Sequence, residues 1–289
     1  MNAIRLHDKP SADYRDKVQA SVAAIQAVIA DQGERWTQAH SLGVEDIVVT
    51  HLLQAAGVLD TVSVFVLETG RLHAETLALI PRLETHFGVA LQRFEPQHTA
   101  VLHFVRDHGA DAMYQSLALR KACCDIRKME PLARALAGKV GWVTGLRREQ
   151  SNARADVPLI EQEPERVKLN PLADWTWGDV WHCIAEHALP YHPLHDAFYP
   201  SIGCEPCTRA ISLGEDFRAG RWWWEHSGAK ECGLHVKPHA SGSESAAGTA
   251  QAHASAAGVK DAPAFDRSQH SGAKACGLHV KPHASALPT

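Results

Sequence analysis

The chain has 289 residues, of which 45% are hydrophobic and 21% charged, a composition typical of a globular protein with one large domain or two small ones. Its net charge of −4 does not favour a general binder of nucleic acid or of anionic membranes, and no apolar run approaches the roughly 20 residues of a membrane helix. The N-terminus lacks the apolar segment of a secretory signal, so we expect a cytoplasmic protein whose seven cysteines are metal ligands, catalytic thiols or core residues.

Helical and strand patterns alternate along the first two thirds of the chain. Strands are expected at 35–40, 61–70, 89–96, 140–146 and 166–172. Helices are expected at 14–30, from about 45, at 71–88 with Pro81 as a point of kinking or interruption, and at 98–108, 114–136 and 176–189. This alternation predicts an α/β fold with an open, mostly parallel sheet. Ligands on such sheets bind at the carboxyl ends of the strands, where the turns at 41–46, 67–71 and 145–148 would lie.

The composition changes twice after the last predicted helix. Residues 190–235 are irregular, and residues beyond them are small and polar, with too few bulky apolar side chains for a core. We expect a single α/β domain over residues 1–235 and a flexible tail over 236–289. The segment 270–285 repeats 226–241 at 15 of 16 positions, and this duplication is too short for a repeat fold.

Four cysteines occur in two short motifs. Cys123 and Cys124 are adjacent in RKACCDIRK, and Cys204 and Cys207 form a C-x-x-C in SIGCEPCTRAI. Four converging thiolates can hold zinc or an iron–sulfur cluster, and adjacent cysteines on a helix point about 100° apart, which suits the larger cluster better than one ion. The alternative is that the adjacent pair Cys123 and Cys124 occurs by chance and that the C-x-x-C motif is redox-active or structural. Cys183, on an apolar helix, is expected to be a core residue.

Eight segments identify a resemblance to a known family. They follow one another between residues 40 and 235: SLGVEDIVVTHL, FVLETGRLHAETL, RKACCDIRKMEPL, TGLRREQSNAR, NPLADWTWGDVW, LHDAFYPSIGCEPCTRAI, GEDFRAGRWWWE and KECGLH. The chain resembles the assimilatory adenylyl-sulfate reductases, the iron–sulfur branch of the phosphosulfate reductases. The resemblance implies a Rossmann-like, adenine nucleotide alpha-hydrolase-like fold with a modified pyrophosphate loop. It also implies reduction of adenosine 5′-phosphosulfate to sulfite and AMP by thioredoxin in sulfate assimilation, and a [4Fe-4S] cluster on Cys123, Cys124, Cys204 and Cys207.

The turn SLGVED is suited to an anion. Its small residues allow close backbone approach, and the following helix presents free N–H groups, although an ordinary turn with acidic residues at a helix N-terminus is the alternative. The resemblance matches the pyrophosphate loop to Ser41, Gly43 and Asp46. It matches Leu67 and Thr69 to adenosine contacts, with Gly145 in a similar place.

An anionic substrate also requires cations. The segment GLRREQS offers Arg147 and Arg148, and arginine forks match sulfate and phosphate oxygens. The resemblance matches Lys128, Arg218 and Arg221 to substrate-binding positions. The two arginines would share a face if their segment is helical, and Lys128, four residues after Cys124, would couple the cluster to the substrate. The tryptophans at 222–224 are expected to pack.

The motif KECGLH contains the expected nucleophile. The thiolate is the reactive form of cysteine, and Lys230 and His235 could favour it at Cys232. The resemblance implies that Cys232 attacks the substrate sulfur to give an S-sulfocysteine, from which a thioredoxin thiolate releases sulfite. The duplicated copy reads KACGLH and is expected to leave Cys276 inert, although the linker is long enough for a backup thiol.

Several alternatives remain open from the sequence. One is a reductase acting on both phosphosulfates, or only on the 3′-phosphorylated one, although relatives of that kind typically lack the four cysteines. Another is a zinc-stabilised nucleotide-binding protein without redox chemistry, and a third is an ATP-cleaving enzyme with a pyrophosphate loop. The oligomeric state, a homo-oligomer included, is left open. We expect the cluster to act electrostatically and structurally rather than to deliver electrons.

Overall fold

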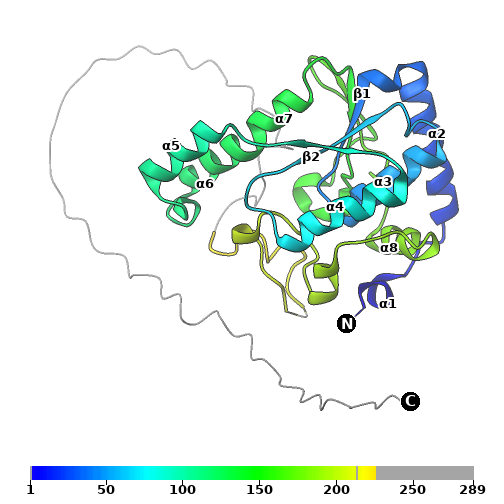
Figure 1. Ribbon diagram of the computed structural model, residues 1–289. Helices are drawn as coiled ribbons and strands as arrows, with labels where there is room; N and C mark the ends of the chain where they lie inside the picture. Colours follow the sequence, from blue (N-terminus) through cyan, green and yellow to red (C-terminus); the bar gives the residue numbers. More distant parts are fainter. Residues whose placement is uncertain (1, 213, 226–289) are drawn as a thin grey trace, which may run out of the picture. The chain divides into compact units, whose positions relative to one another are not determined.

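Six strands form one sheet in the order β3-β2-β1-β4-β6-β5 (Figure 1). The strands are β1 (Trp36–Ala39), β2 (Ser63–Leu67), β3 (Leu91–Phe94), β4 (Gly141–Val143), β5 (Ile160–Gln162) and β6 (Val167–Leu169). The structure, a computed structural model, describes residues 2–212 and 214–225. Neighbouring strands run parallel except β5, which pairs antiparallel with β6 at the edge. The predicted open, mostly parallel sheet is therefore confirmed.

Helices cover both faces of this sheet. They are α1 (Ala3–His7), α2 (Tyr14–Ile29), α3 (Val44–Ala55), α4 (Ala74–Phe87), α5 (His98–His108), α6 (Leu117–Cys124), α7 (Glu130–Ala135) and α8 (Trp177–Glu186). Alternate residues of β2 enter different cores, as the two-residue period of a strand requires. Val64 and Val66 pack with α2, α3, α4 and α8, whereas Phe65 packs with α7.

Two local expectations were wrong in detail. The fifth predicted strand is only the short β6, and β5 was missed because an edge strand with Ile160 47% exposed lacks the apolar pattern of a buried strand. Helix α4 runs unbroken through Pro81. The carbonyl of Leu77 loses its hydrogen-bond donor to this proline, but Leu77 lies on the exposed side, where water can replace the lost bond.

The predicted helix 114–136 is divided into several pieces. A single turn, η2 (Ala112–Tyr114), precedes α6, and a π-helical segment, η3 (Asp125–Met129), joins α6 to α7. Ser116 caps α6 by accepting a hydrogen bond from the backbone N–H of Leu119. Lys128 therefore lies in a π-helical turn, where residues four apart do not overlap as in an α-helix.

The segment after α8 is irregular, as expected, and is held onto the rest of the domain. Isolated bridges join Leu72 to Cys204 and Thr208 to Arg221. Arg218 lies in a turn and Arg221 in the isolated bridge to Thr208, so the helical face considered for them is absent from this segment. The remaining short helical turns are η1 (Ala30–Arg35), η4 (Arg148–Gln150), η5 (Asn152–Arg154), η6 (Pro193–Ala197) and η7 (Glu205–Cys207).

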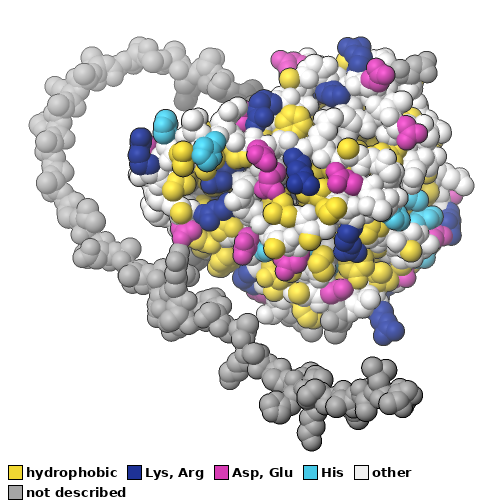
Figure 2. Space-filling model, in the orientation of Figure 1, with side chains coloured by type: hydrophobic (Ala, Val, Ile, Leu, Met, Phe, Trp, Pro, Cys, Tyr) yellow, Lys and Arg dark blue, Asp and Glu magenta, His cyan; other side chains and the backbone are white. Residues whose placement is uncertain are grey.

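The described residues all belong to one compact unit. Several predictions fall outside the described residues: the boundary at 235/236, the tail with its duplication, and the roles of Cys232, His235 and Cys276. Among the helices of the described ranges, none combines the length and apolar character that a membrane crossing requires. Acidic and basic side chains are interspersed over the face shown in Figure 2.

Candidate active site

A cavity of about 220 Å³ lies at the carboxyl ends of β1, β2 and β4. The turns predicted to meet at this edge contribute Ser41 and Gly43 after β1, Leu67 and Thr69 around the end of β2, and Gly145 after β4. In the sheet order, β1 and β4 are neighbours whose chain connections lead away on opposite sides. The cavity therefore occupies the topological switch point, where open α/β sheets bind ligands.

Asp46 joins two of these turns. Its carboxylate accepts hydrogen bonds from the Ser41 N–H at 2.7 Å, from the Ser41 hydroxyl, and from the Gly145 N–H at 3.0 Å. Burial raises the pKa of Asp46 to about 6, although these hydrogen bonds act in the opposite direction. The carboxylate is thus engaged by the protein, and it shapes the cavity that Ser41 and Gly43 line.

The N-terminus of α3 opens toward the cavity without a side-chain cap. Gly43 is the N-cap residue and lines the cavity, and no side chain there accepts a hydrogen bond from the first turn. Free N–H groups at this end of a helix of 12 residues favour an anion. Gly145 allows the close approach of the β4 turn, since a Cβ there would lie 2.6 Å from Asp46 Oδ1 and 2.8 Å from Glu45 Cβ.

Arg147 has a different position from the one expected for a substrate contact. Its side chain is 1% exposed, does not line the cavity, and pairs with Glu45 at 3.1 Å and Glu149 at 2.9 Å while lying over the ring of Trp177. Burial would raise the pKa of Glu45, but Arg147 and a hydrogen bond from Gln150 hold it below its usual value. Arg147 therefore fixes the first turn of α3.

Three predicted cations do line the cavity, namely Lys128, Arg218 and Arg221. The cavity is also lined by Arg154, His40 and His195, which no sequence motif had indicated. Burial lowers the pKa of His40 to about 3 and that of His195 to about 4, so both imidazoles are neutral. His195 lies inside the matched segment LHDAFYPSIGCEPCTRAI and His40 directly precedes SLGVEDIVVTHL, but a single buried histidine has no pattern of its own.

The four cysteines of the two motifs surround a second, smaller cavity of about 20 Å³. Cys123, Cys204 and Cys207 are buried, Cys124 is partly exposed, and all four are free thiols. The second motif is positioned by the chain itself: the Glu205 N–H donates to the Arg71 carbonyl at 2.8 Å, and Cys204 Sγ lies 3.3 Å from Thr69 Oγ1.

The chemistry of this donor set fits a group that carries positive iron or zinc. Burial, with the neighbouring thiols, raises the pKa of Cys207 to about 12, and burial also raises the pKa of Cys123, so a bound cation is what would ionise them. Basic side chains also line the cavity and compensate the charge of four thiolates: Arg71, Arg120, Arg127, Lys128 and Arg221.

Lys128 and Arg221 line both cavities. Arg221 reaches this position past Gly203, where a Cβ would lie 2.4 Å from its guanidinium. The two sites therefore share a cationic wall. The described chain ends next to it, because Glu225 pairs with Arg120 at 2.8 Å and Arg120 lines the cysteine cavity.

Comparison with known proteins agrees with this geometry. Residues 35–210 match the family model of the phosphoadenosine phosphosulfate reductase domain. The chain is 51% identical over 225 residues to an adenosine 5′-phosphosulfate reductase of Burkholderia cepacia, covering 76% of this chain and 89% of the relative. It is 50% identical over 204 residues to one of Allochromatium vinosum, covering 70% and 79%.

Among solved structures, the chain is similar to the phosphoadenylyl-sulfate reductase of Candida auris, with a TM-score of 0.54 and 22% identity over 68% of this chain and 97% of that one. This likeness confirms the predicted fold class. The chain therefore belongs to the phosphoadenosine phosphosulfate reductase family, among the adenosine 5′-phosphosulfate reductases.

Proposed function

We propose that this protein reduces adenosine 5′-phosphosulfate to sulfite and AMP, with thioredoxin as the cytoplasmic electron donor. The observation that carries the proposal is the shared wall between the two cavities. One cavity has the position and lining of a nucleotide site, the other gathers four cysteines, and Lys128 and Arg221 belong to both. The relatives named adenosine 5′-phosphosulfate reductase support the choice of substrate.

The phosphosulfate would lie between α3 and the cations. The uncapped first turn of α3 offers N–H groups, and Lys128, Arg218 and Arg221 offer positive charge on the opposite wall. Leu67 and Thr69, at the end of β2, would contact the adenosine. Arg147 would act through Glu45, by fixing the turn that binds the anion.

Cys123, Cys124, Cys204 and Cys207 would hold a [4Fe-4S] cluster. When bound, the cluster would supply local charge and a rigid link between two chain segments. Lys128 and Arg221 would place their positive charges between the thiolates and the substrate oxygens. These charges would draw electron density from the sulfate group and so help AMP to leave.

Cys232 is the proposed nucleophile. Its thiolate forms a bond to the substrate sulfur while the bond from that sulfur to the bridging oxygen breaks, and AMP leaves. A thioredoxin thiolate then attacks the Cys232 sulfur and releases sulfite, and the second thioredoxin thiol resolves the mixed disulfide, so the dithiol supplies both electrons. Cys232 lies seven positions after Glu225, a span of at most ~25 Å, and His235 lies near it in sequence.

Intact-protein mass spectrometry tests this mechanism. The anaerobic enzyme is mixed with adenosine 5′-phosphosulfate without thioredoxin, and wild type should gain the mass of one SO₃ group. Cys232→Ser should abolish the adduct, whereas Cys276→Ser, the matched control in the duplicated segment, should keep it. An adduct that survives in Cys232→Ser would place the nucleophile elsewhere, and its absence from wild type with an intact cluster would refute covalent catalysis.

Two further measurements separate the alternatives. The first compares kcat/KM for adenosine 5′-phosphosulfate with kcat/KM for its 3′-phosphorylated form. We expect a higher value for the form without the 3′-phosphate. Iron and zinc analysis distinguishes the cluster from a zinc site, and zinc without iron in active protein would contradict the cofactor assignment.

A further inference from the structure

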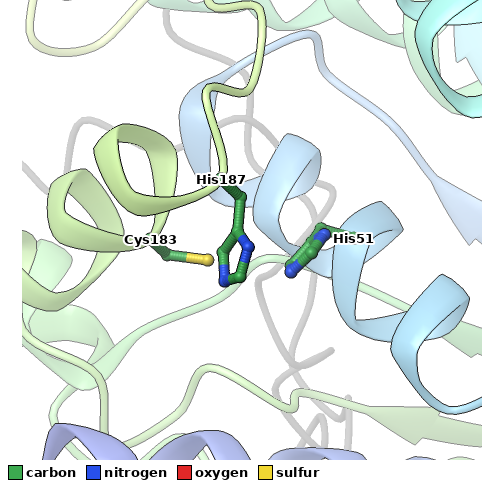
Figure 3. Close-up of side chains that lie close together, drawn as sticks. All are labelled: His51, Cys183 and His187. Carbon is green, nitrogen blue, oxygen red and sulfur yellow. The ribbon is translucent and has the colours of Figure 1, made fainter.

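Three potential metal ligands converge at a place that shares no lining residue with the two cavities. His51 belongs to α3, Cys183 to α8, and His187 is the C-cap residue of α8. Figure 3 shows the three side chains turned toward one another. One ligand atom from each lies within 4.8 Å of the others, and the rings of His51 and His187 have centroids 4.1 Å apart.

The sequence spacing explains the convergence. Cys183 and His187 are four residues apart, so they lie on one face at the end of α8. That face packs against α3, which presents His51. Cys183 is fully buried, which confirms the expectation of a core residue, and His187 has 39% of its side chain exposed. The group therefore lies at the edge of the core, with an opening to solvent on the histidine side.

The donor set suits a borderline-soft divalent cation. Two imidazoles and one thiolate are typical ligands of Zn²⁺, which binds nitrogen at 2.0–2.1 Å and sulfur at about 2.3 Å. In a tetrahedron these lengths place the ligand atoms about 3.3–3.6 Å apart. Ligand atoms separated by the full 4.8 Å would thus have to approach one another by about 1.2–1.5 Å, which side-chain rotation can supply. The fourth position would be left to water.

The surroundings support coordination. Glu186 Oε2 lies 3.5 Å from His187 Nε2, an arrangement that orients an imidazole and makes it more basic toward a metal. Tyr14 donates a hydrogen bond to the same carboxylate at 3.1 Å and also interacts with the Cys183 sulfur. Burial, with the nearby His187 and His86, lowers the pKa of His51 to about 4, so its ring is neutral at pH 7.

We propose that His51, Cys183 and His187 form a Zn²⁺ site separate from the four-cysteine cavity. Binding would convert the Cys183 thiol to a thiolate and release its proton to solvent. The ion would tie α3 to α8. Helix α3 begins at the active site, since Gly43 lines the cavity, and Trp177 at the start of α8 lies against Arg147, which pairs with Glu45 in the first turn of α3. The site would therefore act as a structural clamp between α8 and α3, the helix whose first turn lines the substrate cavity.

Metal titration of the cluster-loaded, full-length protein tests this proposal. Wild type should bind one more equivalent of Zn²⁺ than either His187→Ala or Cys183→Ala. Co²⁺ in place of Zn²⁺ should give a thiolate-to-cobalt charge-transfer band that both variants lack. His103→Ala, which removes an exposed histidine from α5, is the matched control and should behave as wild type. The tail histidines are present in every variant, so their binding cancels.

Stability provides a second readout. Zn²⁺ should raise the Tm of wild type and of His103→Ala but not of His187→Ala, because a ligand stabilises only the state that binds it. His187 is partly exposed, so its removal leaves the core intact even if Cys183→Ala folds poorly. Equal stoichiometry, spectra and Tm shifts in all variants would show adventitious binding only and overturn the site. Neither outcome depends on the reductase activity.

Discussion

The buried ion pair between Arg120 and Glu225 should be the strongest single anchor of the segment that leads toward Cys232. Arg120 has 2% of its side chain exposed and Glu225 10%, and the two groups are bidentate at 2.8 and 3.1 Å. Glu225→Ala would leave a buried guanidinium without its carboxylate, which costs about 3–5 kcal/mol. The ring of Trp222, 4.7 Å from Arg120, remains as a partial substitute, so we expect about 3 kcal/mol.

Thermal unfolding of the cluster-loaded protein measures this cost. For a domain of this size, 1 kcal/mol shifts Tm by about 2–4 °C, so Glu225→Ala should lower it by about 6–12 °C. Glu130→Ala is the matched control, because Glu130 forms an equally bidentate pair with Arg134 at 2.7 and 3.1 Å but both side chains are 40% exposed. An exposed pair of this kind contributes about 0.5 kcal/mol, or about 1–2 °C.

Equal Tm shifts in the two variants would refute the reasoning, since the Arg120–Glu225 pair is buried and joins distant segments whereas the Glu130–Arg134 pair is exposed and local to one helix. If the segment is anchored as described, Glu225→Ala should also slow formation of the Cys232 adduct, and Glu130→Ala should not. A normal adduct rate together with a large loss of stability would show that the anchor holds the fold without positioning the nucleophile.

Three further predictions concern the walls of the cavities. Gly145→Ala should cost about 1–3 kcal/mol of stability and weaken substrate binding, because its Cβ would overlap Asp46 and Glu45; unchanged Tm and KM would contradict the tight packing there. Lys128→Ala should raise KM for the substrate and also change the visible spectrum of the cluster, since Lys128 lines both cavities; an effect on only one of them would argue against a shared wall. Asp46 has a pKa of about 6 in the folded state against a usual 3.8, so the stability it contributes is present below pH 3.8 and is lost as pH rises through 6, by up to about 3 kcal/mol. The Tm of wild type relative to Asp46→Asn should accordingly fall between about pH 3.8 and pH 6, and a flat difference would show that Asp46 has an ordinary pKa.

The central sheet and the turns at its carboxyl edge could be predicted from the sequence, because they depend on local residue patterns. The buried strands are β-branched and apolar, and the turns after β1, β2 and β4 contain the small residues that mark a switch point. The grouping of the four cysteines followed from residue type and from the family resemblance. Cys232 and His235 stay predictions, because they lie outside the described residues.

The parts that could not be predicted depend on distant partners. Arg147 was expected to face an anion, but Glu45, 102 residues away in the chain, binds its guanidinium. His40 and His195 line the cavity because of how their loops fold back, which no spacing encodes. The trio of His51, Cys183 and His187 was missed for the same reason, since one ligand comes from a helix far from the other two in sequence.

Because of the π-helical segment between α6 and α7, insertions and deletions in this region should damage the fold more than substitutions do. The α6 end is anchored by Cys123 in a cluster with Trp222, and the α7 end by Leu132 in a cluster against the sheet. Deleting one residue from η3 would turn these ends by about 100° relative to each other. Substitutions in η3, which has no fully buried residue, should be tolerated better than insertions or deletions, except at Arg127 and Lys128, which line the cysteine cavity.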